Sequence, residues 1–169
     1  WKYMGNDSIY IPAAFALLFT LLTLGLLLCA LAFLRSRIQG YLAAMILLGT
    51  PLFIMMGASQ FADVPLAFFM LATLVLLFFP ARSPENWSGA PVLAGIAAGL
   101  CAWTKNEGLL FLLIVTGSLF CTTLYADGWR SARKSTVRFL AGALPILLIV
   151  IYFKTQLSHY GKLGVHCFD

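Results

Sequence analysis

Charged residues are scarce in this sequence. Only 10% of the 169 residues are Asp, Glu, Lys or Arg, whereas soluble proteins have about 25%. Hydrophobic residues make up 62% of the chain, and the mean hydropathy is +0.94. This balance excludes an ordinary soluble domain and predicts an integral, multi-pass membrane protein.

Metal-binding and redox motifs are also missing. The four cysteines, Cys29, Cys101, Cys121 and Cys167, form no C-x-x-C pair and lie near no histidine cluster. Three of them stand inside apolar runs, where a thiol usually acts as a small hydrophobe. We therefore expect no zinc or redox centre. No cleavable signal peptide, fixed repeat or separate soluble domain can be recognised either.

Long apolar runs fill most of the chain, separated by short polar stretches. A bilayer span needs about 20 apolar residues, with a range of about 17–25. Because backbone polar groups must be satisfied inside lipid, each run is expected to be a helix. We predict an all-α transmembrane helical bundle that forms one domain over residues 1–169. Its expected spans are approximately 9–34, 40–59, 64–80, 90–104, 108–125 and 138–157.

Two features of the runs predict local geometry. Pro51 stands inside the second run and is expected to kink that span. Gly95 and Gly99 form a small-x-x-x-small stripe, which lets a neighbouring helix approach closely.

The distribution of charge predicts the orientation. With six spans, one set of loops holds the whole net charge of +5, and the other set sums to zero. The basic set contains Arg35, Arg37, Arg82, Arg130, Arg133, Lys134 and Arg138, with Glu85 and Asp127. The neutral set contains Lys2, Lys105, Lys154 and Lys162, with Asp7, Asp63, Glu107 and Asp169. The basic loops are expected to be cytoplasmic, and no nucleic-acid partner is needed to explain them.

Asp63 stands directly before an apolar run, in "FADVPLAFF". It fits a helix N-cap, where an Asp side chain accepts a backbone N–H and complements the helix dipole. It also fits a carboxylate that faces a watery cavity and holds a divalent cation. The two interpretations are compatible, since capping uses only part of the acceptor capacity of a carboxylate.

Lys105 and Glu107 stand in "TKNEG", between the fourth and fifth runs. Snorkelling and a local ion pair would explain them as anchors at the membrane edge. However, two charges and an Asn are more than a short turn requires. A lysine here could hold a phosphate, and Glu107 could balance that lysine or join a metal site. We predict a tight exoplasmic turn between two helices.

The stretches "FADVPLAFFMLATLVLL" and "LAGIAAGLCAWTKNEGLLFLL" resemble the GT-C superfamily of polytopic glycosyltransferases. The similarity is greatest to family 39, which includes the protein O-mannosyltransferases, and to the related aminoarabinose transferases. It covers residues 41–120 by motif and the flanks by hydropathy. In that family an acidic residue, often followed by Pro, opens an exoplasmic helix, and the next span ends in Lys.

The resemblance implies transfer of a sugar from a polyprenyl-phosphate donor to an exoplasmic protein, glycan or lipid acceptor. Asp63 matches an acidic position that lines the cavity and binds a metal or the donor phosphate, and Lys105 matches the Lys near that phosphate. Glu107 is placed as a further substrate-binding residue. A bacterial or archaeal plasma membrane is the expected location.

One departure concerns the principal catalytic carboxylate, which the family carries in its first large exoplasmic loop. Asp7 lacks the expected surroundings, so we expect the base to lie upstream and this chain to be an inactive central part. Two other classes fit the composition: a secondary transporter or channel, and a non-catalytic membrane subunit that assembles through its glycine stripe. A transporter is disfavoured, because every strong charge lies at the end of a run.

Overall fold

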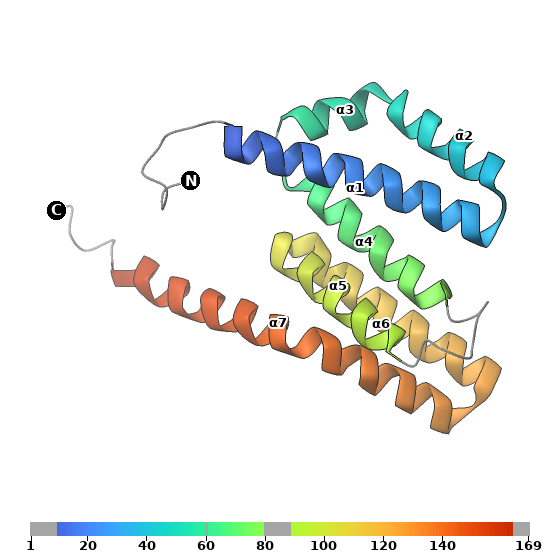
Figure 1. Ribbon diagram of the computed structural model, residues 1–169. Helices are drawn as coiled ribbons and strands as arrows, with labels where there is room; N and C mark the ends of the chain where they lie inside the picture. The colour runs from blue at the N-terminus through green and yellow to red at the C-terminus, as the bar shows by residue number, and fades with distance from the viewer. Residues whose placement is uncertain (1–9, 60, 80–88, 164–169) are drawn as a thin grey trace. The chain divides into compact units, whose positions relative to one another are not determined.

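The computed structural model describes residues 10–59, 61–79 and 89–163, with side chains described as far as residue 155. Within them the chain is helical and has no strand, which confirms the all-α prediction (Figure 1). The helices are α1 (Tyr10–Leu34), α2 (Arg37–Leu48), α3 (Pro51–Ala58), α4 (Asp63–Phe78), α5 (Ala90–Thr104), α6 (Asn106–Asp127) and α7 (Trp129–Leu163). They divide into two units, Trp1–Ala90 and Pro91–Asp169.

In the first unit, α1 contacts α2, α3 and α4. Phe19 of α1 meets Phe68 and Phe69 of α4, with ring centroids 5.6 Å apart in both pairs. On the other helices, glycines allow close approach. A Cβ on Gly40 would lie 2.7 Å from the Leu28 carbonyl oxygen of α1, and one on Gly57 would lie 2.6 Å from Thr20 Oγ1. The long α1 is therefore the element on which this unit is assembled.

The expected kink at Pro51 is confirmed. The second apolar run forms α2 and α3, which are bent by 66° at the break. Pro51 begins α3, where its missing N–H leaves no helical bond unmade. The preceding Thr50 is extended, with φ −84° and ψ 109°, the conformation that a following proline favours.

In the second unit, α5 packs against α7 through residues with little or no side chain. A Cβ on Gly95 would overlap the Phe139 carbonyl of α7, and one on Gly142 of α7 would overlap the Val92 carbonyl of α5. A Cβ on Gly99 would lie 3.1 Å from Ile146 Cβ. The predicted stripe is confirmed, and its partner is the helix that bears Gly142.

The helix lengths refine the expected spans. Three helical stretches are long and apolar enough to cross a bilayer, namely α1, α6 and residues 129–155 of α7, and the bent α2–α3 pair would make a fourth. α4 and α5 have 16 and 15 residues, or about 24 and 22 Å at 1.5 Å per residue, against a hydrocarbon core of about 30 Å. The six-span count and the single domain over residues 1–169 stay predictions.

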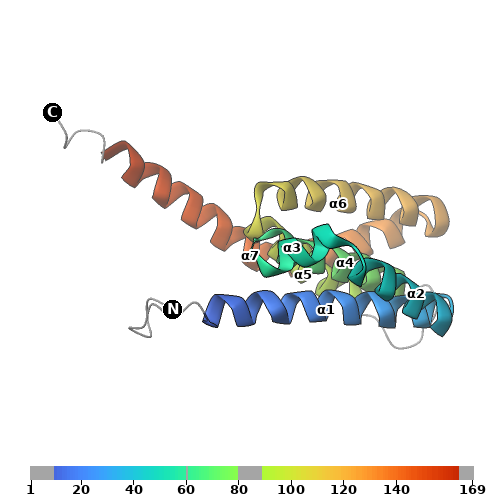
Figure 2. The ribbon, with the colours of Figure 1, turned by 90° about the horizontal axis from the view of Figure 1, so that it is seen from above.

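The helix that contains the last expected span is longer than that span. The expected span begins at residue 138, whereas α7 starts at Trp129 and has 35 residues. Its first turns contain Arg, Lys and Ala, which have high helix propensity although they interrupt the apolar run. Figure 2 shows α7 extending well past the α5–α6 turn.

The glycine contact between α5 and α7 predicts the effect of one added methyl group. Gly95→Ala should lower the melting temperature of the purified full-length protein, because a Cβ there meets backbone that cannot move aside. Overpacking of this kind costs about 1–3 kcal/mol. Gly117→Ala is the matched control, since a Cβ on Gly117 of α6 meets nothing within 4 Å. It should be neutral or stabilising by up to about 1 kcal/mol. Equal melting temperatures for the two variants would contradict the contact.

Candidate functional site

The turn between α5 and α6 consists of a single non-helical residue, Lys105. Its backbone is extended, with φ −152° and ψ 162°, and α6 begins at the next residue, Asn106. The Lys105 N–H donates to the Cys101 carbonyl at 3.3 Å, and the Gly108 N–H donates to the Lys105 carbonyl at 3.0 Å. The predicted break between two helices at Lys105 is confirmed, whereas Glu107 lies in the first turn of α6 and not in the connection.

Gly108 allows this turn to be so short. A Cβ on Gly108 would overlap the carbonyl of Cys101, so the first turn of α6 lies directly against the last turn of α5. Cys101 itself is fully buried. Any larger residue at position 108 would push the two helices apart at the point where Lys105 connects them.

A cavity of about 640 Å³ opens beside this turn, within the second unit. Its wall comes from the end of α5, the start of α6 and the facing part of α7. The lining residues are Ala102, Trp103, Thr104, Lys105, Asn106, Glu107, Val150, Phe153 and Lys154. Two of the three residues selected from the sequence, Lys105 and Glu107, thus line one cavity.

Lys154 is a cavity residue that sequence reasoning missed. Its Nζ donates to Asn106 Oδ1 at 2.8 Å and so connects α7 to the first residue of α6. In the sequence, Lys154 counted only as one of the charges that set the orientation. Nothing in the local pattern around it points to residues 48 positions earlier; only the packing of α7 along α5 and α6 brings the two together.

The remaining wall is largely aromatic. The rings of Trp103 and Phe153 lie 6.1 Å apart at an angle of 60°, and both residues are about half exposed. Trp103 stands near the end of α5, where an interfacial aromatic residue is common, and it lies on the cavity wall as well. The cavity therefore combines an apolar surface with two cations and one carboxylate, which suits an amphipathic anion.

Asp63 lies in the first unit, at the first position of α4, and is partly exposed. The N-cap interpretation is wrong by one position, because Ala62 occupies the N-cap and supplies no side-chain bond. Asp63 still lies in the first turn, where its charge complements the helix dipole. An apolar cavity of about 280 Å³, lined by residues of α1 and by Ala62, Val64 and Pro65, lies next to it.

Metal ligands do not gather within the described ranges. No three His, Cys, Asp or Glu side chains there lie close enough together to hold a metal ion. Among the described residues, Cys29, Cys101 and Cys121 form no disulfide, while Cys167 lies outside the described residues. Within the described residues, Asp63 thus belongs to no group of three possible ligands.

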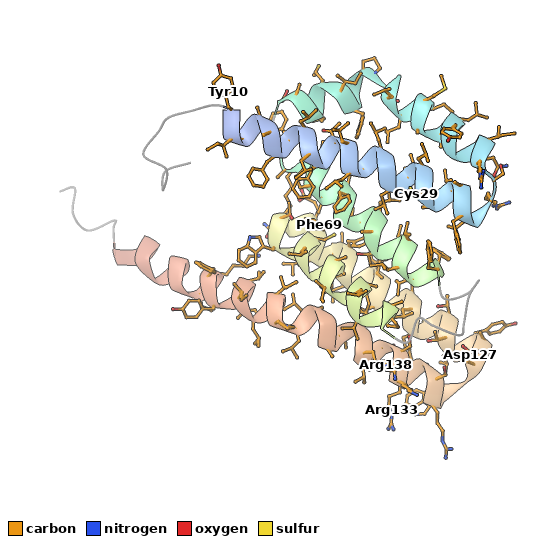
Figure 3. All side chains as sticks on the ribbon, viewed as in Figure 1. Tyr10, Cys29, Phe69, Asp127, Arg133 and Arg138 are labelled. Carbon is orange, nitrogen blue, oxygen red and sulfur yellow. The ribbon has the colours of Figure 1, made fainter. Side chains whose placement is uncertain are left out.

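The opposite end of the second unit is basic. Arg130, Arg133, Lys134 and Arg138 follow one another along the first turns of α7, close to the turn that joins it to α6 (Figure 3). The 22 residues of α6 separate this group from the α5–α6 turn by about 33 Å. The two groups of charges therefore lie at opposite ends of one long helix, as the predicted orientation requires. The charges at 2, 7, 82, 85, 162 and 169 lie outside the described side chains.

Comparison with known proteins gives one match. A family model described as dolichyl-phosphate-mannose-protein mannosyltransferase matches residues 4–153. Searches of curated proteins and of solved structures found no match. Since the family model covers most of the chain and the helices are apolar enough to span a bilayer, the chain belongs to the dolichyl-phosphate-mannose-protein mannosyltransferase family, whose members are membrane glycosyltransferases of the GT-C type.

Proposed function

We propose that this protein transfers a sugar from a polyprenyl-phosphate donor to a hydroxyl or similar nucleophile on an exoplasmic protein, glycan or lipid. The observation that carries the proposal is the cavity of about 640 Å³, which is lined by Lys105 and by the aromatic residues Trp103 and Phe153. Family membership supports sugar transfer over a transporter or an assembly subunit. A lipid phosphate has an anionic phosphate and an apolar chain. The cavity provides a lysine that could bind the phosphate and an aromatic surface that could contact the chain.

Lys105 is proposed to bind the donor phosphate. When the bond between the anomeric carbon and the phosphate oxygen breaks, its electron pair stays on that oxygen, so negative charge grows there. A preorganised ammonium group stabilises this charge more in the transition state than in the ground state. α6 begins at the next residue, and the partial positive charge at its N-terminus would stabilise the same negative charge.

The carboxylates have different proposed roles. Glu107 lines the same cavity as Lys105 and would contact the sugar or limit the positive charge of the site. Asp63 of the first unit is proposed as a further substrate-binding residue, and this role rests on the resemblance to the family alone. Neither is proposed as the base; the carboxylate that takes the proton of the acceptor is expected elsewhere in the protein.

A divalent metal ion held in part by Asp63 is a separate proposal that rests on the resemblance to the family. The described residues supply no complete ligand set, so no step of the transfer is assigned to a metal. If Asp63 binds an essential metal, EDTA should abolish transfer by the full-length enzyme, and added Mg²⁺ or Mn²⁺ should restore it. Unchanged activity in EDTA would leave Asp63 without a metal role.

The site assignment predicts the effects of two substitutions in the full-length enzyme. Lys105→Met and Asp63→Asn should each lower sugar transfer from a polyprenyl-phosphate donor by roughly a hundredfold, because each removes a charge while nearly keeping the shape. Lys134→Met and Asp127→Asn are the matched controls at the basic end of the second unit, and both should keep normal turnover. Melting temperatures should hardly change. Near-normal turnover in Lys105→Met and Asp63→Asn would refute both assignments.

The proposed orientation can be tested in intact cells. After the four native cysteines are replaced, a cysteine at Asn106 should react with an impermeant thiol reagent from outside. A cysteine at Ser131, near the other end of α6, should react only after permeabilisation. Labelling of the Asn106 position from the cytoplasm alone would reverse the proposed side of the active site.

A further inference from the structure

Lys154 and Asn106 form a contact that the proposed function does not yet use. The 2.8 Å hydrogen bond from Lys154 Nζ to Asn106 Oδ1 joins α7 to the first residue of α6. Both residues line the same cavity as Lys105. The cavity therefore has one lysine on each of two walls that are far apart in the sequence.

The contact differs from simple snorkelling. A snorkelling lysine extends along apolar surface to place its ammonium in water, whereas this ammonium is held by a side chain of the neighbouring helix. Asn106 is neutral, so the bond orients Lys154 without neutralising its charge. It also uses only one of the three N–H donors of the ammonium. An oriented cation on a cavity wall is suited to bind an anion.

We propose that Lys154 is a second phosphate-binding residue and that Asn106 positions it, so that the phosphate of a lipid phosphate lies between Lys105 and Lys154. The proposal rests on the proposed function, whose donor it defines more closely. Trp103 and Phe153, which lie on the same wall, would contact the lipid chain next to the phosphate. The ligand class is thus an isoprenoid-type lipid phosphate rather than a free phosphate or a membrane headgroup.

The negative charge of the lipid phosphate increases during the reaction, and a second cation would stabilise it. As the acceptor oxygen bonds to the anomeric carbon, the bond from that carbon to the phosphate oxygen breaks and the acceptor proton passes to the base. The phosphodiester, with one negative charge, becomes a phosphomonoester with about two at neutral pH. Two lysines therefore match the leaving lipid phosphate better than the intact donor.

This role can be tested without depending on turnover if the binding of lipid and phosphate probes to the full-length protein is measured by native mass spectrometry. The probes are a polyprenyl phosphate, the matching polyprenol, inorganic phosphate and phosphatidylglycerol. Lys154→Met should weaken binding of the polyprenyl phosphate by about tenfold, the effect of losing one charge-assisted hydrogen bond, and should leave polyprenol binding unchanged. Lys154→Arg should largely restore binding, and Lys134→Met, an exposed lysine on the same helix, should have no effect.

Asn106→Asp separates positioning from simple structural support. Asp keeps an acceptor for Lys154 and strengthens the contact, so a structural role predicts equal or higher thermal stability and normal binding. Our proposal predicts the same stability but weaker binding of the polyprenyl phosphate, because the new carboxylate neutralises Lys154 and repels the phosphate. In turnover measurements on Lys154→Met, the fold decrease in kcat should be larger than the fold increase in the KM for the donor.

The outcomes are distinguishable. Normal polyprenyl-phosphate binding by Lys154→Met would overturn the inference and leave the proposed function intact. Equally tight binding of inorganic phosphate, or full competition by phosphatidylglycerol, would overturn the lipid-phosphate assignment. If the wild-type protein binds the lipid phosphate through Lys154 but transfers no sugar, the proposed function fails and the binding site stands.

Discussion

The close approach of helix backbones in the second unit is the constraint on which the candidate site depends. Gly108 lets the start of α6 lie against the Cys101 carbonyl, and Gly95 and Gly142 let α5 and α7 meet backbone to backbone. In lipid, apolar side chains gain little from leaving their surroundings, so packing between small residues has to hold such helices together. The same contacts bring Lys154 of α7 to Asn106 of α6. Without the three glycines the cavity would lose its facing walls.

The bilayer explains why charges and cavity occur where they do. A charged side chain inside hydrocarbon is costly, so the second unit carries its charges near the ends of α6 rather than in its middle. At one end they form the basic start of α7, for which the orientation rule is a sufficient explanation. At the other end, two lysines, a glutamate and an asparagine surround a cavity with an aromatic wall. Composition alone does not distinguish these ends; the cavity does.

Much of the fold could be predicted because hydropathy and a few special residues act locally. Pro51 determines a bend through its own ring and its missing N–H. The polar "TKNEG" interrupts an apolar run regardless of how the helices pack. The errors have local reasons too. Charged residues with high helix propensity moved the start of α7 forward to Trp129. Asp63 belongs to the first turn of α4 but not to its cap, since the helix begins one residue earlier than the sequence suggested.

By itself, the sequence determined the membrane class, the helical fold, the break at Lys105 and the glycine stripe, because each follows from the chemistry of neighbouring residues along the chain. It also supplied Lys105 and Glu107 as candidates. Only the tertiary structure decided which helix meets the stripe and which residues complete the cavity. Asn106 and Lys154 are 48 positions apart, and no periodicity links them. Their contact exists because glycine and alanine surfaces let α7 lie along α5, a geometry that depends on the whole helix pair.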